Sequence, residues 1–246
     1  IIFKKKSNSK NWGTIALIGN KTNGSNFKNI IFENGSGKSI DGINYFSSLS
    51  IHSAKNIIFD NILVKDNSKY DDMMHIIYSE DIKVLNSKFL NAHLDSIDVD
   101  ISKNISFKNT AIINSGNDGI DFMESTAYLD QIELISNGDK GISVGENSNI
   151  NINQITGHNS IVGIATKDGS KTIAKNISFT NIDYPFASYQ KKKAYDYGKL
   201  YLEDFTTKNF KKEFINDANS LIINNKSKKE IGINNSEVDK IIENII

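Results

Sequence analysis

Residues 116–125 read GNDGIDFMES, and residues 137–148 read NGDKGISVGENS. Both stretches contain a charged residue and a glycine before an apolar–polar–apolar triplet, and the triplets begin at Ile120 and Ile142, 22 residues apart. The column that these two residues define continues at intervals of 22 or 23 residues through Ile51, Met74, Ile97, Ile120, Ile142, Ile164 and Phe186. A second column lies two residues further on, at Ser53, Ile76, Val99, Phe122, Val144, Thr166 and Ser188. Most of the chain is therefore predicted to be one structural repeat.

The alternation within each repeat predicts short β-strands. Residues two apart, such as Ile97 and Val99, would point inward together while the residue between them points outward. A repeat of this length cannot bury its own apolar side, so the repeats must stack. The predicted fold is an all-β parallel solenoid of about eight coils, in which each strand pairs with its counterpart one coil away at about 4.8 Å.

A third series consists of an apolar residue followed two positions later by Asn, Gln or Asp. Asn tolerates the left-handed conformation that tight turns require, and stacked amides can hydrogen bond to one another. This series predicts an asparagine ladder at one corner of the solenoid. Its members are Phe32/Asn34, Phe59/Asn61, Val84/Asn86, Phe107/Asn109, Leu129/Gln131, Ile152/Gln154, Phe179/Asn181 and Leu202/Asp204.

These columns and phrases resemble the single-stranded right-handed parallel β-helix repeat proteins of the pectin-lyase-like superfamily, over roughly residues 12–207. The phrases around Asp118 and Lys140 look most similar to bacterial β-helix proteins found beside spore-coat kinase-like (CotH-type) modules. The resemblance implies the fold and no established activity. We expect residues 1–207 to form the β-helix and residues 208–246 a C-terminal cap or tail with a short helix after Ser236.

Composition excludes several classes of function. The chain of 246 residues has no Cys, which excludes disulfides and Cys-ligated metals, and all 29 basic residues are Lys, which excludes a catalytic arginine. A net charge of zero argues against a nucleic-acid partner, and no apolar run approaches the ~20 residues of a membrane span. The chain starts at Ile1 rather than Met, so we expect a fragment or processed product, with an adjacent module absent, from an extracellular or cell-surface protein.

Ionisable residues gather on the middle coils. The outward-facing column one residue beyond the Ile column is His52, His75, Asp98, Asp121, Ser143, Ala165 and Ala187. The column two residues before the Ile column is Leu49, Asp72, Asp95, Asp118, Lys140, Val162 and Tyr184. Flanking these columns are Tyr78, Asp100, Glu124, Asp139 and Glu146. Because stacked like charges repel one another, the cluster predicts a bound cation, protonated carboxyls, or a loosely solvated face.

Three interpretations follow. In the first, the face binds and modifies an extended polysaccharide, as the resemblance implies, by lyase, epimerase or glycoside hydrolase chemistry. Asp98 and Asp121 would then be the catalytic carboxyl pair and His75 a proton shuttle. Predicted substrate-binding residues are Asp72, Asp95, Asp118, Lys140, Ser143, Tyr78, Glu124 and Glu146. In the second, the module is structural, adhesive or Ca²⁺-binding, and the candidate cation ligands are Asp95, Asp98, Asp118 and Asp121. In the third, the acidic columns are the solvated face of a domain that assists a neighbouring catalytic module.

Overall fold

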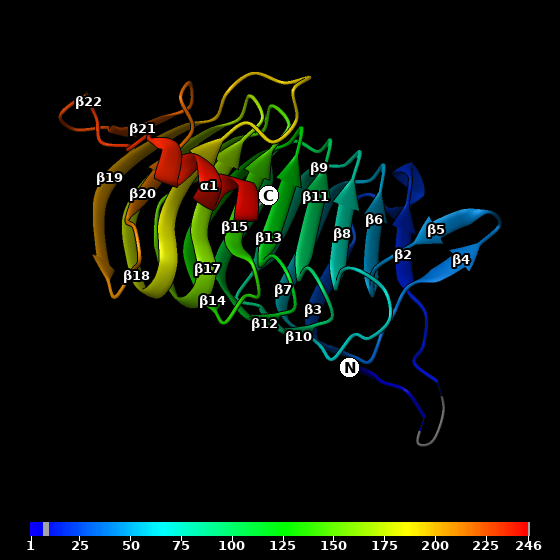
Figure 1. The fold of residues 1–246 in the computed structure, drawn as a ribbon. Coiled ribbons are helices and arrows are strands. Elements are labelled where there is room, and N and C mark those ends of the chain that lie inside the picture. The colour runs from blue at the N-terminus through cyan, green and yellow to red at the C-terminus, as the bar shows by residue number, and fades with distance from the viewer. Residues whose placement is uncertain (7–9, 246) are drawn as a thin grey trace.

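The computed structural model describes residues 1–6 and 10–245. These residues form a parallel β-solenoid of about eight coils with one short C-terminal helix (Figure 1). Strands in one coil pair in parallel with strands in the coils before and after it. The predicted all-β solenoid is therefore confirmed.

One sheet, here called the first sheet, carries the candidate site. It contains β2 (Ile15–Ile18), β6 (Leu49–His52), β8 (Met74–Ile77), β11 (Ile97–Asp100), β13 (Ile120–Met123), β15 (Lys140–Gly145), the last parts of β17 (Ile155–Lys167) and β18 (Lys171–Tyr189), and β20 (Phe214–Asn216). The other sides of the solenoid are built from the rest of β17 and β18 together with β1 (Ile2–Phe3), β3 (Asn26–Glu33), β7 (Lys55–Lys65), β9 (Glu80–Leu85), β10 (Lys88–Ala92), β12 (Ile105–Ser115), β14 (Thr126–Ile135), β16 (Asn149–Ile152), β19 (Lys199–Lys208) and β21 (Leu221–Asn224). A 3₁₀ helix, η1 (Asn20–Thr22), and an antiparallel hairpin of β4 (Lys38–Ile40) and β5 (Ile43–Tyr45) are inserted between the early strands.

The predicted Ile column is confirmed from β8 to β18 and wrong at its start. Met74 pairs in register with Ile97, and the pairing continues one coil at a time to Phe186. In β6, however, Leu49 lies opposite Met74, so Ile51 lies opposite Ile76. The coil between β6 and β8 is two residues longer than the 23-residue interval, and Leu49 and Ile51 are both apolar with the same strand parity. His52 consequently lies opposite Ile77 rather than His75.

The apolar–x–Asn series combines two separate rows. Phe59 pairs with Phe27, whereas Phe32 pairs with Val64, and Phe179 pairs with Gly157 rather than with the row of Ile152. Each coil has two corners with the same motif, so spacing alone could not separate them. One row contains Asn29, Asn61, Asn86, Asn109, Gln131, Asn176 and Asp204, and the other contains Asn34, Asp66, Asn91, Asn114, Ser136, Asn159, Asn181 and Asn209, all with positive φ. Amides hydrogen bond between coils within each row, as in Asn109 Nδ2 to Asn86 Oδ1 at 2.8 Å.

A row of buried serines fixes the corner that follows the first sheet. Ser102 Oγ accepts the Ser79 N–H at 3.0 Å, and Ser125 Oγ accepts the Ser102 N–H at 2.9 Å. Each hydroxyl also donates to the carbonyl two residues earlier, at Asp100 and Met123 respectively. The hydroxyls of Ser102 and Ser125 thus both accept and donate a hydrogen bond, and these bonds hold the ends of β11 and β13 in place.

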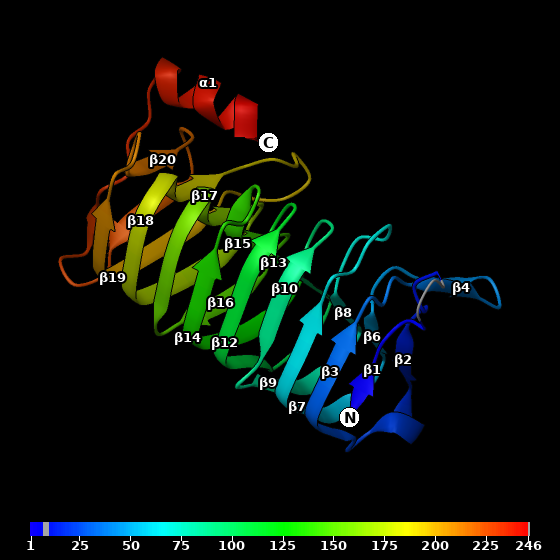
Figure 2. The same cartoon turned by 90° about the horizontal axis from the view of Figure 1, so that it is seen from below.

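Beyond residue 207 the parallel pairing continues through β20 and β21, and β22 (Lys229–Glu230) turns back antiparallel to β21. Helix α1 (Ser236–Ile245) begins after Asn235, whose Oδ1 accepts the N–H groups of Glu237 and Val238. Figures 1 and 2 show α1 on the outside of the first sheet, where Val238 and Ile242 are buried against Ala187 and Ile215. No helix in residues 1–6 and 10–245 is long and apolar enough to cross a membrane.

Candidate functional site

Three neighbouring strands of the first sheet place the central residues of the site. His75 on β8 pairs with Asp98 on β11, and Asp98 pairs with Asp121 on β13. Their side chains are partly exposed, whereas Met74, Ile97 and Ile120 on the same strands are buried in the core. The predicted register of His75, Asp98 and Asp121 on one outer face is therefore confirmed.

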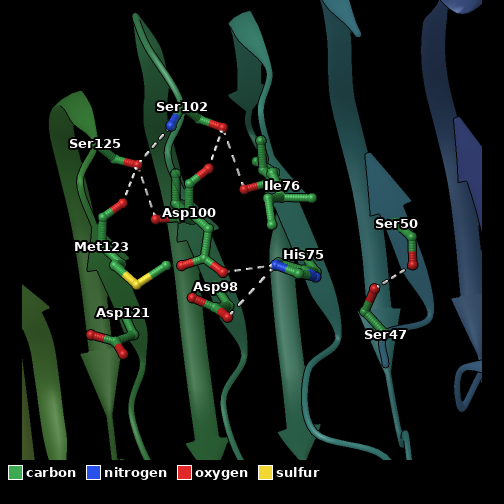
Figure 3. Close-up of polar contacts among 12 residues, drawn as sticks. Ser47, Ser50, His75, Ile76, Asp98, Asp100, Ser102, Asp121, Met123 and Ser125 are labelled. Atoms are coloured by element: carbon green, nitrogen blue, oxygen red, sulfur yellow. Dashed lines mark hydrogen bonds and ion pairs between the residues drawn. The ribbon is translucent and has the colours of Figure 1, made fainter. Parts of the chain in front are cut away.

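The imidazole of His75 reaches diagonally to the neighbouring strand (Figure 3). Its Nε2 lies 3.1 Å from Asp100 Oδ2, at hydrogen-bond distance, and 3.8 Å from Asp98 Oδ2. Asp100 follows Asp98 by two residues on β11, so both carboxyls point outward from one strand. The sequence indicated Asp100 only as a flanking residue, whereas the structure makes it the closest partner of His75.

The second polar column lies beside the first and is more deeply buried. Asp95 Oδ1 accepts the Asp118 N–H at 2.6 Å, and Asp118 Oδ1 accepts the Lys140 N–H at 2.9 Å. These two carboxyls thus tie each coil to the next. Asp72 is 4% exposed, and its carboxyl has no hydrogen-bond partner among the described residues. In this column, Asp95 and Asp118 therefore connect neighbouring coils, whereas Asp72 is a buried acid without such a bond.

Burial and mutual repulsion raise the pKa values of four of these carboxyls. Burial, followed by the charge of Asp98, raises the pKa of Asp72 well above its ordinary value. Burial, with the charges of Asp100 and Asp121, does the same for the pKa of Asp98. Burial also raises the pKa of Asp95 to about 6 and that of Asp118 to about 7. These four carboxyls of the site therefore keep their protons to a higher pH than an ordinary Asp does.

Two lysines partly balance the cluster. Lys140 Nζ lies 3.8 Å from Asp118 Oδ1 and also contacts Asp139. Burial lowers the pKa of Lys140, but the charges of Asp118 and Asp139 outweigh burial and raise it overall. Lys167 Nζ lies 3.8 Å from Asp121 Oδ1. These lysines form ion pairs with Asp118 and Asp121. Within the described residues, the ion pairs of Asp98 and Asp100 are with His75 and not with a lysine.

Within residues 1–6 and 10–245, two groups of side chains could hold a metal ion. His75, Asp98 and Asp100 offer one nitrogen and two oxygen ligands within 4.8 Å of one another, and Asp71, Asp72 and Asp95 offer three oxygens within the same limit. Of the four predicted cation ligands, Asp98 belongs to the first group and Asp95 to the second. Asp118 and Asp121 belong to neither and are paired with lysines.

The remaining predicted residues lie at the edges of the face. Tyr78 is 60% exposed at the corner after β8. Glu124 accepts a hydrogen bond from Tyr195 at 3.1 Å, and Glu146 is paired with Lys192. Both partners come from residues 190–197, which lie along this corner. Ser143 is fully buried, and its Oγ has no hydrogen-bond partner in the part of the chain that the structure describes.

The fold, but not the sequence, has recognisable neighbours. No protein-family model matches the chain, and no curated protein matches it. Among solved structures, an alginate lyase from Paenibacillus sp. str. FPU-7 aligns with a TM-score of 0.60 at 11% identity, covering 78% of this chain and 71% of the lyase. A polygalacturonase from Erwinia carotovora aligns with a TM-score of 0.56 at 13% identity, covering 91% of this chain and 77% of that chain.

A pectate lyase from Paenibacillus sp. 0602 aligns with a TM-score of 0.58 at 8% identity, covering 83% of this chain and 68% of that chain. These neighbours are right-handed β-helix proteins of the pectin-lyase-like kind, which confirms the expected architecture. At such low identities the likeness concerns the fold alone. Nothing in the comparisons supports the resemblance to proteins found beside CotH-type modules.

Proposed function

We propose that the acidic face of the first sheet binds an extended polysaccharide and cleaves it by glycoside hydrolysis. The observation that carries the proposal is the pairing, on one outer face, of a carboxyl with a raised pKa, Asp98, and a lysine-paired carboxyl, Asp121. A glycosidase needs one protonated and one ionised carboxyl on either side of the bond to be broken. The names of the structural neighbours, which include a polygalacturonase and two polysaccharide lyases, support the substrate class.

Each residue then has a role. Asp98 donates its proton to the leaving oxygen, and Asp121, beside Lys167, acts as the nucleophile. Strands one coil apart are separated by about 4.8 Å. This is close to the ~5–5.5 Å carboxyl separation of retaining enzymes, so we expect the anomeric configuration to be retained. Asp98 then takes the proton of the water that hydrolyses the glycosyl–Asp121 ester, which restores both carboxyls. His75, hydrogen bonded to Asp100 and 3.8 Å from Asp98 Oδ2, positions the carboxyl of Asp98 for both steps. The exposed ring of Tyr78 offers an apolar surface for a sugar.

A second candidate is cation-dependent lyase or epimerase action on a uronate polymer, favoured by the two possible metal-binding groups. A cation between Asp98 and Asp100 would neutralise the sugar acid, and the same carboxyls would repel a uronate without it. The two mechanisms are mutually exclusive at Asp98, because a carboxyl that binds a cation has lost the proton required for hydrolysis. Either activity would place the protein where polysaccharides occur, at the cell surface or outside the cell.

Purified protein should be incubated with xylan, polygalacturonate and alginate, with EDTA or with added Ca²⁺. For hydrolysis, we expect saturated products in EDTA, inhibition by the cation, and loss of turnover in Asp98→Asn and Asp121→Asn. A lyase would instead need the cation and release unsaturated products that absorb in the ultraviolet. Glu133→Gln, on a different side of the solenoid, is the matched control. Unchanged turnover in both Asp variants would overturn the proposal, and binding without turnover would favour a non-catalytic module.

A further inference from the structure

The open part of the face ends abruptly at Asp121. Along the outward column, the exposed fraction of the side chain is 13% for His75, 25% for Asp98 and 32% for Asp121. One coil further on, Ser143 is fully buried, and Ala165 and Ala187 after it are also fully buried. Asp121 is therefore the last accessible member of its column among the described residues.

Two segments form a wall at this point. Helix α1 covers the first sheet beyond β15, with Val238 and Ile242 buried against Ala165, Ala187 and Ile215 (Figure 2). Residues 190–197 lie along the corner that follows the first sheet, where Tyr195 contacts Glu124 and Lys192 contacts Glu146. Backbone groups of this segment also form hydrogen bonds. The N–H groups of Lys191 and Lys192 donate to Asp168 Oδ1 at 2.7 and 2.6 Å, in addition to the ion pair of Lys192 with Glu146.

In the opposite direction the column of His75 also closes, because Ser50, which pairs with His75, is fully buried, whereas the neighbouring outward column of Asp100 stays open. Going from Asp100 towards the N-terminal coils, the residues that pair one after another are Ile77 on β8, His52 on β6 and Ile18 on β2. Ile77 and His52 are partly exposed, and Ile18 is 49% exposed. The hairpin of β4 and β5 projects away from the solenoid beyond this end of the sheet (Figure 1). A ligand can therefore lie along the column of Asp100, over the coils of β2, β6 and β8, and reach the wall only with its end.

We infer that the protein acts on chain ends: the polysaccharide enters from the N-terminal coils, and α1 with residues 190–197 stops it just past the Asp98–Asp121 pair. This inference rests on the proposed function and adds the mode of attack. The covered part of the sheet begins one coil, about 4.8 Å, beyond Asp121, so only a short terminal piece fits between the carboxyl pair and the wall. The protein releases products of one short length rather than a mixture of lengths.

The test uses the wild-type protein and oligosaccharides of xylose and of galacturonate, each labelled at one end, with polymer viscosity followed in parallel. We expect a single short product from one end and little loss of viscosity per bond broken. Val238→Ser/Ile242→Ser, which loosens α1, should raise mid-chain cleavage several-fold, and Glu243→Ser on the exposed side of α1 should not change it.

Turnover with random product lengths in the wild type would overturn the inference and leave the proposed function intact. Failure of every labelled oligosaccharide and of the polymers to bind or react would overturn both. If the α1 variant does not fold, the wild-type product pattern still decides the question.

Discussion

Asp98 shows how position sets the chemistry of a single carboxyl. It lies between Asp121 on one neighbouring strand and His75 on the other, with Asp100 two residues along its own strand. Burial and the negative charges of Asp100 and Asp121 raise the pKa of Asp98, so its proton is hard to remove. Burial and neighbouring carboxyl charges also raise the pKa values of Asp72, Asp95 and Asp118. Together with Asp98, these residues therefore titrate as a group of coupled acids rather than independently.

These raised pKa values make the free energy of unfolding depend on pH. The four carboxyls bind protons more tightly in the folded than in the unfolded state. Their stabilising effect is thus complete below the ordinary Asp value of 3.8 and is lost as the pH rises through the folded values, about 6 for Asp95 and about 7 for Asp118.

We expect the free energy of unfolding in urea to fall by a few kcal/mol between about pH 4 and pH 8 in EDTA. Asp118→Asn keeps the acceptor oxygen for Lys140 N–H and should flatten this slope. The exposed Asp41→Asn should leave the slope unchanged. A stability that rises steadily over this range would contradict the arrangement of acids described above.

A divalent cation should reverse this loss of stability. Bound by His75, Asp98 and Asp100, it would neutralise negative charge on this face at pH 8, and a ligand present at 100 times its Kd adds about 2.7 kcal/mol. We expect Mn²⁺ or Ca²⁺ to raise the melting temperature at pH 8 and to have little effect at pH 4.5. Asp98→Asn/Asp100→Asn should abolish the rise, and an equal rise in that variant would exclude this group as the cation site.

Among the structural elements, the row of buried serines stabilises a corner that was not predicted from the sequence. Ser79, Ser102, Ser125, Ser148 and Ser170 recur at the interval of the Ile column, so the signal was present in the sequence. Serine is common at turns in any case, so its recurrence alone does not indicate a hydrogen-bonded row. Removing one hydroxyl leaves a buried backbone N–H without an acceptor, which costs about 1–3 kcal/mol.

We therefore expect Ser125→Ala to lower the free energy of unfolding by about 1–3 kcal/mol, because the Ser102 N–H loses its acceptor. Ser106→Ala is the matched control, since Ser106 lies on β12 with its side chain partly exposed on an outer surface of the solenoid. Chemical denaturation of the two variants at pH 7 measures the difference. Equal stabilities would show that the row contributes no more than an ordinary surface serine.

Strand register was predictable wherever the period was regular. Between β8 and β18 the coils vary by one residue at most, and the apolar column identifies each partner. The predicted register was wrong at Ile51 and at Phe32. At Ile51 the coil is longer and Leu49 is equally apolar, and at Phe32 a second corner carries the same motif. Hydrophobic pattern fixes which face a residue occupies, but it does not fix which of two equivalent positions it takes.

Across the whole molecule, stability is the sum of coils and of the contacts between neighbouring coils. Deleting residues 97–119 removes one complete coil and brings β13 beside β8 with the core columns in register. We expect this variant to unfold cooperatively with a urea m-value lower by roughly a tenth. Deleting only residues 97–108 breaks the register and should abolish cooperative unfolding. Cooperative unfolding in both variants, or in neither, would contradict a stacked repeat.

The candidate site was only partly predictable at this scale. The repeat interval brought together His75, Asp98 and Asp121 although they are distant in sequence. The bond from His75 to Asp100 depends on the direction in which a long side chain leans, which strand periodicity does not give. The wall exists because α1 packs against the first sheet through Val238 and Ile242. The apolar side of α1 can be predicted from the sequence, but the surface that it covers cannot.

The most direct test of the acidic face as the functional site is NMR of protein labelled at His and Asp side chains, titrated with xylose and galacturonate oligosaccharides. We expect shifts concentrated at the imidazole of His75 and at the carboxyl carbons of Asp98, Asp100 and Asp121. Shifts confined to another side of the solenoid, such as the surface around Tyr128, or no shift with any oligosaccharide, would contradict it.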